Sequence, residues 1–149
     1  MSSETQSSTT NQKLNSSASA AAKRILIVED SPMNRELLND YLGYLGYEVF
    51  ALAEGSGFFQ ALIDFQPDLI LLDLKLPDID GYTILQQIQE GTDWLHIPII
   101  VVSAFAFQVD KEKALRLGAR RFIVKPVNIV DLKQAIQEEL QMGSLEASC

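Results

Sequence analysis

Five polar residues stand at or next to the ends of short apolar segments, and their side chains are of types that could act together. They comprise three carboxylates, one hydroxyl and one ammonium group: Glu29, Asp30, Asp73, Ser103 and Lys125. One acid in such a position is usually a solvated strand end. Five groups of complementary chemistry are harder to explain in that way if the fold brings them to one edge.

The charges of these groups indicate what they would bind. Two carboxylates about 5 Å apart repel by roughly 3 kcal/mol at an effective dielectric constant near 20, so three together need a counter-charge or shifted pKa values. Lys125 supplies one positive charge, and Mg²⁺, which takes oxygen ligands, would complete the site. With the metal bound, Asp73 could act as a nucleophile toward a phosphoryl group. Ser103 and Lys125 would then hydrogen-bond the transferred oxygens.

The apolar segments alternate with segments of helical periodicity, and this alternation predicts the elements that position the five residues. The predicted strands are residues 25–28, 47–51, 69–72, 97–102 and 121–124. The predicted helices are residues 32–46, 56–65, about 81–90, 107–117 and 128–141. Strands that alternate with helices in this way predict an α/β fold, a doubly wound five-stranded parallel sheet with helices on both faces. Ligands of such sheets bind at the carboxyl ends of the strands.

Local signals support several of these boundaries. Ser31-Pro32 is typical of an N-cap and first helical turn, and Gly118 is typical of a C-terminal cap. Apolar residues recur at helical spacing in the first predicted helix: Met33, Leu37, Leu38, Tyr41, Leu42 and Leu45. Gly55-Ser56-Gly57 lacks the spacing of a dinucleotide-binding loop, so we interpret it as a loop and helix start.

The composition excludes several classes of protein. The chain has 149 residues, with 20 acidic and 12 basic side chains and a net charge of −8, which argues against direct nucleic-acid binding. One cysteine and one histidine cannot form a structural zinc site. No apolar stretch approaches the ~20 residues that cross a bilayer, and no signal peptide is visible. We therefore expect a soluble, cytoplasmic protein that makes no membrane contact.

The chain divides into one domain and two ends. Residues 1–22 are rich in Ser, Thr, Asn, Gln and Ala, and such a segment buries too little apolar surface to fold by itself, which predicts a disordered tail. Residues 23–142 form the expected domain. Residues 143–149 form an expected frayed C-terminus.

Four segments in this order resemble the motif blocks of the response-regulator receiver domain, the CheY-like domain of two-component and phosphorelay signalling. They read ILIVEDSPMNRELL, PDLILLDLKLPDIDGY, VVSAFA and FIVKP, within roughly residues 24–142. The resemblance implies a flavodoxin-like (βα)₅ fold. It also implies that Asp73 is phosphorylated by the phosphohistidine of a sensor histidine kinase or a histidine phosphotransfer protein.

The resemblance implies roles for individual residues. Glu29 and Asp30 match the acidic pair that binds Mg²⁺ beside the phosphoacceptor Asp73, and the backbone carbonyl of Lys75 matches a further ligand. Ser103 matches the hydroxyl residue that follows the phosphoryl group.

Three further matches concern Lys125, Pro126 and Phe122. Lys125 matches the lysine of the family's site, and the peptide bond before Pro126 is cis in the family. Phe122 matches the aromatic switch residue, which turns inward when Ser103 moves.

Lys75 and Phe105 match positions that influence hydrolysis of the acyl phosphate in the family. Bulky Phe105 should hinder attacking water, which predicts a comparatively long-lived phosphoryl group. Lys75 could orient water as easily as block it.

Only about seven residues follow the expected domain, too few for a separate output domain. We therefore expect a signalling switch that acts on no substrate other than its own phosphoryl group. Its output would go through a downstream protein that contacts the fourth helix, fifth strand and fifth helix, or the chain is one domain of a hybrid kinase.

Two alternatives remain open at this point. One is an interaction module of the same fold that is never phosphorylated. The other is a flavin-binding electron carrier, against which the acidic Glu29-Asp30 loop argues, because a flavin phosphate needs amide donors and hydroxyls there.

Overall fold

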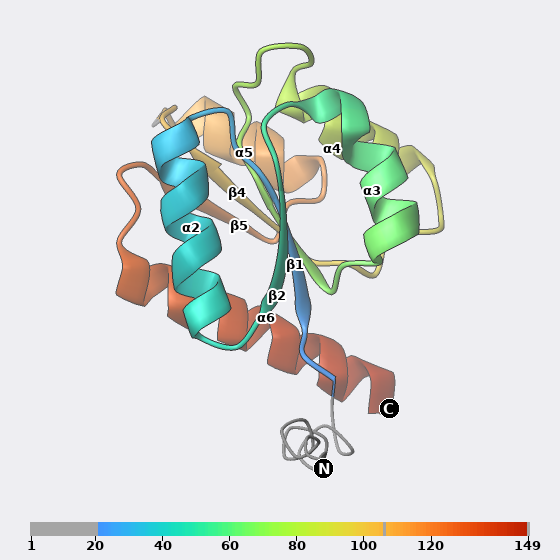
Figure 1. Ribbon diagram of the computed structural model, residues 1–149. Helices are drawn as coiled ribbons and strands as arrows, with labels where there is room; N and C mark the ends of the chain where they lie inside the picture. The colour runs from blue at the N-terminus through green and yellow to red at the C-terminus, as the bar shows by residue number, and fades with distance from the viewer. Residues whose placement is uncertain (1–20, 106, 149) are drawn as a thin grey trace, which may run out of the picture.

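Five parallel strands form one sheet, and they are described by a computed structural model that covers residues 21–105 and 107–148, with side chains to residue 142. The expected N-terminal tail, apart from residues 21 and 22, lies outside this range. The strands are β1 (Arg24–Val28), β2 (Glu48–Leu52), β3 (Leu69–Leu72), β4 (Ile99–Ser103) and β5 (Arg121–Val124). Their order is β2-β1-β3-β4-β5, which confirms the predicted fold class (Figure 1).

The helices cover both faces of this sheet (Figure 1). They are α2 (Pro32–Tyr44), α3 (Phe58–Phe65), α4 (Gly81–Glu90), α5 (Gln108–Arg116) and α6 (Ile129–Ser148), and a short 3₁₀ turn, η1 (Gly55–Gly57), precedes α3. Side chains of α2 and α6 pack on one face of the sheet, and side chains of α3, α4 and α5 pack on the other. This three-layer arrangement encloses two cores.

Alternation along the strands divides their side chains between the two cores. In β1, Ile25 and Ile27 face α2 and α6, whereas Leu26 and Val28 face α3 and α4. All four side chains are at most 1% exposed, because a parallel sheet covered on both faces buries both sets.

The order of the strands reverses between β1 and β3. The chain leaves β1 toward β2 and then returns to the other side of β1 as β3. Since all neighbouring pairs are parallel, the carboxyl ends share one edge, and the reversal leaves a crevice there between the loops after β1 and β3.

The ends of α2 and α5 agree with their sequence signals. The Ser31 side chain accepts a hydrogen bond from the Asn34 N–H at the start of α2, and Gly118 has a φ of +106° just beyond α5. Both predicted caps are confirmed, as is the interpretation of residues 55–57 as a turn at a helix start.

Other boundaries differ from the predictions. β4 begins at Ile99 rather than at residue 97, because the Ile97 N–H bonds the Trp94 carbonyl in a turn and Pro98 has no N–H to donate. β2 is displaced by one residue, to Glu48–Leu52. α6 continues to Ser148, beyond the predicted end at residue 141, since no proline interrupts it. The expected frayed end at 143–149 is therefore helical as far as Ser148.

The apolar stripe of α2 is narrower than predicted. Leu38 and Leu42 are buried, but Met33 is 77% exposed and Leu37 is 54% exposed. Met33 lies in the first turn of α2, and Leu37 precedes the buried Leu38 by one residue, so the core does not cover either side chain.

The single tryptophan lies at the edge of the sheet opposite the carboxyl ends of the strands. Trp94 is in the connection from α4 to β4, and its ring centroid is 5.6 Å from that of Phe59 in α3. It is partly buried and packs against the core on the α3 and α4 side.

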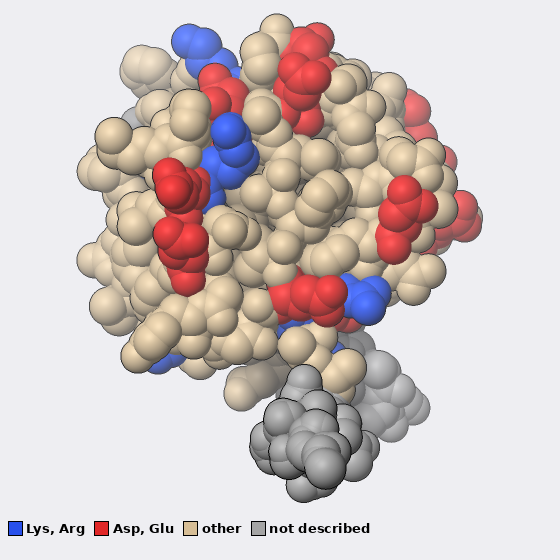
Figure 2. All heavy atoms as spheres, viewed as in Figure 1, with Lys and Arg blue, Asp and Glu red and all other residues tan. Residues whose placement is uncertain are grey.

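Charged side chains are scattered over the face shown in Figure 2, where basic groups occur singly among acidic and uncharged ones. In the part of the chain that the structure describes, none of the helices combines the length and the hydropathy needed to span a bilayer.

Candidate functional site

Three carboxylates meet at the crevice between β1 and β3. Glu29 and Asp30 directly follow β1, and Asp73 directly follows β3. The three offer oxygen atoms that all lie within 4.8 Å of one another. Glu29 and Asp73 are buried, whereas Asp30 is exposed, so the group has one solvent-facing member at its mouth.

Lys125, which directly follows β5, joins this group from across the sheet. Its Nζ lies 3.0 Å from Asp73 Oδ2 and 3.0 Å from Glu29 Oε1. The backbone also holds it in place, since the Lys125 N–H donates to the Ser103 carbonyl at 2.8 Å. The Lys125–Pro126 peptide bond is cis, as the resemblance implied.

The pKa values of Glu29 and Lys125 reflect how crowded the charges are. Burial raises the pKa of Glu29 above its usual value, and the nearby charge of Asp73 adds to this effect against the hydrogen bonds from Lys125 and the Ser31 N–H. Burial by itself lowers the pKa of Lys125, but the hydrogen bonds and charges of Asp73 and Glu29 together raise it. The Lys125 ammonium group thus partly neutralises the negative charge of both buried acids, Glu29 and Asp73.

The donor set fits a hard divalent cation. All three side chains offer carboxylate oxygens, and one ammonium group offsets only one of their charges, so a cation at the exposed Asp30 side would relieve the remaining repulsion. Mg²⁺ binds through one or two carboxylates with water and phosphate oxygens as its other ligands. Glu29, Asp30 and Asp73 are the side chains that would hold it.

The loop after Asp73 begins with an ordered contact. The Lys75 N–H donates to Asp73 Oδ1 at 3.1 Å, which leaves the other carboxylate oxygen to Lys125. The Lys75 side chain is exposed. Its backbone carbonyl as a metal ligand stays a prediction.

Ser103 ends β4 on the strand next to β3. It is 1% exposed, and its Oγ accepts a hydrogen bond from the Phe105 N–H at 3.0 Å. The register pairs Leu72 with Val101, so Ser103 and Asp73 lie at adjoining strand ends. The Ser103 hydroxyl is thus held by the first residues of its own loop.

Phe122 lies in β5, paired with Val101 of β4. Its side chain is partly buried and packs against the core that includes α4 and α5. Its role as a switch stays a prediction.

Lys75 and Phe105 line one cavity of about 370 Å³, formed between the loop after β3 and the loop after β4. Phe105 is 36% exposed. The structure therefore places the two residues expected to affect hydrolysis around the same opening.

Sequence reasoning missed Arg35. Its Nη1 donates to the Glu29 carbonyl at 2.9 Å and reaches the Asp30 carbonyl at 3.4 Å. The available signal was its position in the first turn of α2, which folds back over the loop that carries the two acids.

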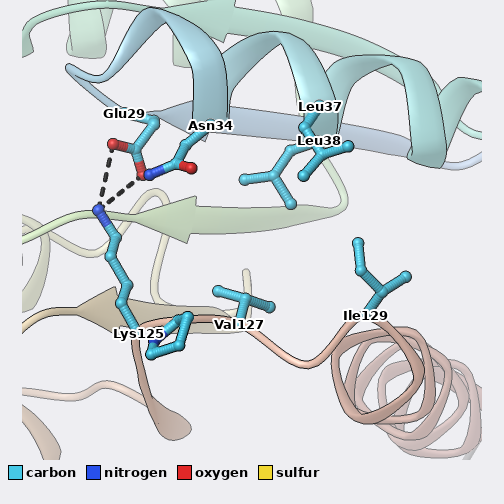
Figure 3. A pocket seen from close by; sticks show the side chains of 8 residues that line it. Glu29, Asn34, Leu37, Leu38, Lys125, Val127 and Ile129 are labelled. Carbon is cyan, nitrogen blue, oxygen red and sulfur yellow. Dashed lines mark hydrogen bonds and ion pairs between the residues drawn. The ribbon is translucent and has the colours of Figure 1, made fainter.

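A second cavity, of about 390 Å³, opens beside Lys125 and was also not predicted (Figure 3). Glu29 and Lys125 face each other at one end of it, with Lys125 Nζ 3.2 Å from Glu29 Oε2. Aliphatic side chains of α2, of the segment after β5 and of the start of α6 line much of the remainder: Leu37, Leu38, Val127 and Ile129. The charged site thus borders an apolar hollow.

The fold and the site together define a doubly wound α/β domain with a lysine-linked acidic pocket at its switch point, and known proteins are similar to this chain over most of its length. The family model of the response regulator receiver domain matches residues 25–137. The polar-differentiation response regulator DivK of Brucella anthropi is 31% identical over 118 residues, which are 79% of this chain and 96% of that protein.

Solved structures agree with this match. A CheY-like response regulator receiver domain protein from Methanospirillum hungatei has a TM-score of 0.79 and 31% identity, covering 85% of this chain and 99% of that one. The receiver domain of the sensor histidine kinase PA1611 from Pseudomonas aeruginosa, with a magnesium ion coordinated in its active-site cleft, has a TM-score of 0.74 and 32% identity. It covers 81% of this chain and 99% of that one.

The chain belongs to the response regulator receiver domain family. It is a receiver domain of two-component signalling, a signalling module rather than a metabolic enzyme. Receiver domains bind Mg²⁺ at an acidic pocket and interact with histidine kinases and phosphotransfer proteins.

Proposed function

We propose that the protein is a phosphorylation-dependent switch whose Asp73 accepts a phosphoryl group from the phosphohistidine of a sensor kinase or histidine phosphotransfer protein. The observation that carries this proposal is the environment of the Asp73 carboxylate. It is 4% exposed, its Oδ2 lies 3.0 Å from Lys125 Nζ, and it shares a site with two further acids. A buried carboxylate with fixed contacts on both oxygens is oriented as a nucleophile.

In the transfer step, a carboxylate oxygen of Asp73 attacks phosphorus, and the bond from phosphorus to the donor imidazole nitrogen breaks. The nitrogen leaves with the electron pair, and the product is an acyl phosphate on Asp73. Glu29, Asp30 and Asp73 would hold Mg²⁺, which when bound would neutralise charge on the phosphoryl oxygens. Lys125 lies within reach of Asp73 and stabilises the same developing charge.

Ser103 and Phe122 form the switch in this proposal. The phosphoryl group adds about −1.5 to −2 charges next to the end of β4. The Ser103 hydroxyl turns toward this charge and gives up the hydrogen bond that it accepts from the Phe105 N–H. The space vacated by Ser103 admits the Phe122 ring. Because Phe122 has no hydroxyl, its inward position requires no buried hydrogen-bond partner.

Apolar side chains on the neighbouring surface support an output through protein contact. The surface of α5, β5 and α6 corresponds to the fourth helix, fifth strand and fifth helix of the sequence prediction. Phe107, Val109 and Val124 are 74%, 67% and 43% exposed along it. Side chains of this kind favour contact with another protein surface rather than with nucleic acid.

Labelling by a small phosphodonor tests the proposal. With Mg²⁺ and acetyl phosphate, the wild-type protein should gain one phosphoryl group, as measured by intact-protein mass spectrometry. Asp73→Asn should gain none, because the amide is a poor nucleophile toward phosphorus. Asp64→Asn, which removes an exposed acid whose contact is with Gln60 on α3, should label like the wild type. Undiminished labelling of Asp73→Asn would overturn the assignment.

Phosphotransfer from candidate histidine kinases of the same organism tests the partner class. The radiolabel should pass from the phosphorylated kinase to the wild-type chain and not to Asp73→Asn. Labelling by acetyl phosphate without transfer from any kinase or phosphotransfer protein would contradict the proposed partners. It would not contradict the assignment of Asp73 as the phosphoacceptor.

A further inference from the structure

The loop that leads from β3 to α4 carries both Asp73 and Lys75, and the beginning of this loop is held against the first residue of α4. The Gly81 N–H donates to the Leu74 carbonyl at 2.8 Å. A Cβ at Gly81 would lie 2.6 Å from Leu74 Cα, so no other residue fits without movement of the loop. This contact fixes Leu74, the residue between Asp73 and Lys75.

Asp78 fixes the far side of the same loop to a different element. Its two carboxylate oxygens accept hydrogen bonds from the backbone N–H groups of Gly55 and Ser56, at 2.8 and 2.7 Å. The bond from Gly55, followed by that from Ser56, holds the pKa of Asp78 below its usual value. The acid therefore binds in its charged form to the turn η1, which belongs to the connection from β2 to α3.

Close packing accompanies these hydrogen bonds. A Cβ at Gly55 would overlap Ile79 Cγ2, and it would lie 3.1 Å from Ile84 Cδ1. Gly55 is buried, and Ile79 packs against the adjacent core. The glycine is thus required for the loop to approach the turn closely enough for Asp78 to reach both amides.

Only Lys75, Leu76 and Pro77 lie between the two fixed points, Leu74 and Asp78. A span of three residues that includes a proline has few conformations once both of its ends are held. The Lys75 carbonyl, the predicted backbone ligand of Mg²⁺, lies in this span. Residues that do not bind the metal but hold one of its ligands in place are important for metal affinity, and their substitution commonly lowers it.

We propose that Asp78 is a positioning residue for the metal site, which by binding the Gly55 and Ser56 amides orients the Lys75 carbonyl toward Mg²⁺. The inference rests on the proposed function, because it concerns the metal that supports phosphorylation of Asp73. Asp78 itself contacts neither the metal nor the phosphoryl group.

Calorimetric titration of Mg²⁺ without a phosphodonor tests this role. Asp78→Ala should weaken Mg²⁺ binding by about 10-fold, as for other residues that orient metal ligands. Asp78→Asn should lose less affinity, because its amide oxygen still accepts one of the two N–H groups. Circular dichroism should show that each variant is folded.

Two further variants separate positioning from loss of charge. Glu54→Gln removes a negative charge beside the same turn, where Glu54 accepts from the Ser56 hydroxyl, and should bind Mg²⁺ like the wild type. Gly55→Ala changes no charge but displaces Ile79, and it should weaken Mg²⁺ binding as Asp78→Ala does. Equal losses in Asp78→Ala, Asp78→Asn and Glu54→Gln, with none in Gly55→Ala, would show that only charge matters and would overturn the inference. Gly55→Ala and Asp78→Asn carry the test if Asp78→Ala does not fold.

Labelling by acetyl phosphate over a range of Mg²⁺ concentrations provides a second readout. Asp78→Ala should need more Mg²⁺ for half-maximal labelling but should reach the wild-type rate at saturation. Wild-type affinity and wild-type half-saturation in Asp78→Ala would overturn the inference while the proposed function stands. Wild-type protein that binds Mg²⁺ but is not labelled overturns the proposed function alone, and wild-type protein that binds no Mg²⁺ overturns both.

Discussion

Lys125 is the residue on which the charge balance of the site depends. It contacts Asp73 and Glu29, which are both buried, and among the residues that the structure describes it is the one cation that contacts these two carboxylates. Two buried acids that share one ammonium group hold a fixed geometry but retain excess negative charge. The contacts with Lys125 therefore hold the two carboxylates in place without a cation, and the remaining negative charge would favour the binding of one.

Phe105 controls the approach of water in our proposal, and this can be measured as the lifetime of the phosphoryl group. Because its ring lines the opening beside Lys75, Phe105→Ala should admit water to the acyl phosphate. We expect hydrolysis about 3- to 10-fold faster, equivalent to up to about 1.4 kcal/mol of activation free energy. The decay of labelled protein after removal of the donor measures this rate.

Phe107→Ala is the matched control for this variant, since Phe107 is 74% exposed and is not among the residues lining that opening. It should decay at the wild-type rate. Slower hydrolysis in Phe105→Ala than in the wild type would contradict the role that we assign to the ring.

The sequence was sufficient to predict the residues of the site that follow directly from strand ends. Glu29, Asp73 and Lys125 meet because parallel strands place their carboxyl ends at one edge, so only the alternation of elements was needed. Arg35 and Asp78 could not be predicted in this way. Their contacts are to backbone carbonyl and amide groups of neighbouring loops, and the path of a loop is not encoded in periodicity.

At the scale of elements, a group of ion pairs joins α6 to the start of β5. Glu139 is 5% exposed and accepts from Arg120 Nε at 3.3 Å and from Arg121 Nε at 2.7 Å. Its hydrogen bond is the largest of the effects that raise the pKa of Arg121 above its usual value. The pairing with Glu139 explains why the Arg121 side chain is only 33% exposed.

Removing the buried partner should destabilise the domain. Glu139→Ala should lower the free energy of unfolding by about 1–3 kcal/mol, because two guanidinium groups lose a charged acceptor. Glu138→Ala is the control: its side chain is 46% exposed and pairs with the same Arg121, and exposed pairs contribute about 0–1 kcal/mol. Urea unfolding followed by circular dichroism measures both, and an equal or larger loss in Glu138→Ala would contradict the ranking.

The sequence was sufficient to locate the five α-helices and five strands of the described residues, but not all of their ends or buried faces. Periodicity predicts Met33 and Leu37 on the apolar face of a helix, yet both side chains are exposed. The width of the buried face depends on how the helix packs against the sheet, which periodicity does not determine. The start of β4 at Ile99 depends on a turn hydrogen bond from Ile97 to Trp94, and composition does not reveal such a bond.

At the scale of the whole molecule, the acidic pocket links metal binding to the stability of the fold. The charges that crowd around Glu29 and Asp73 oppose folding when no cation is present, and they favour binding of one once the sheet has formed. A ligand that binds only the folded state stabilises it in proportion to its occupancy.

Mg²⁺ should therefore raise the melting temperature of the wild-type protein. At a concentration about 100 times the dissociation constant, the expected gain is about 2.7 kcal/mol, and a chelator should reverse it. Asp30→Asn, which removes the exposed carboxylate of the group, should reduce the gain. Thermal unfolding with and without chelator measures this effect, and a melting temperature independent of Mg²⁺ in the wild type would exclude a metal site in the folded domain.

The position of Trp94 has a practical consequence for fluorescence spectroscopy. The chain contains one tryptophan, and it packs against Phe59 at the edge of the sheet away from the acidic pocket. Its emission should therefore change when the core opens and stay nearly constant when the pocket is filled. One optical signal can thus follow unfolding without interference from occupancy, and a dye attached near the pocket can report occupancy independently.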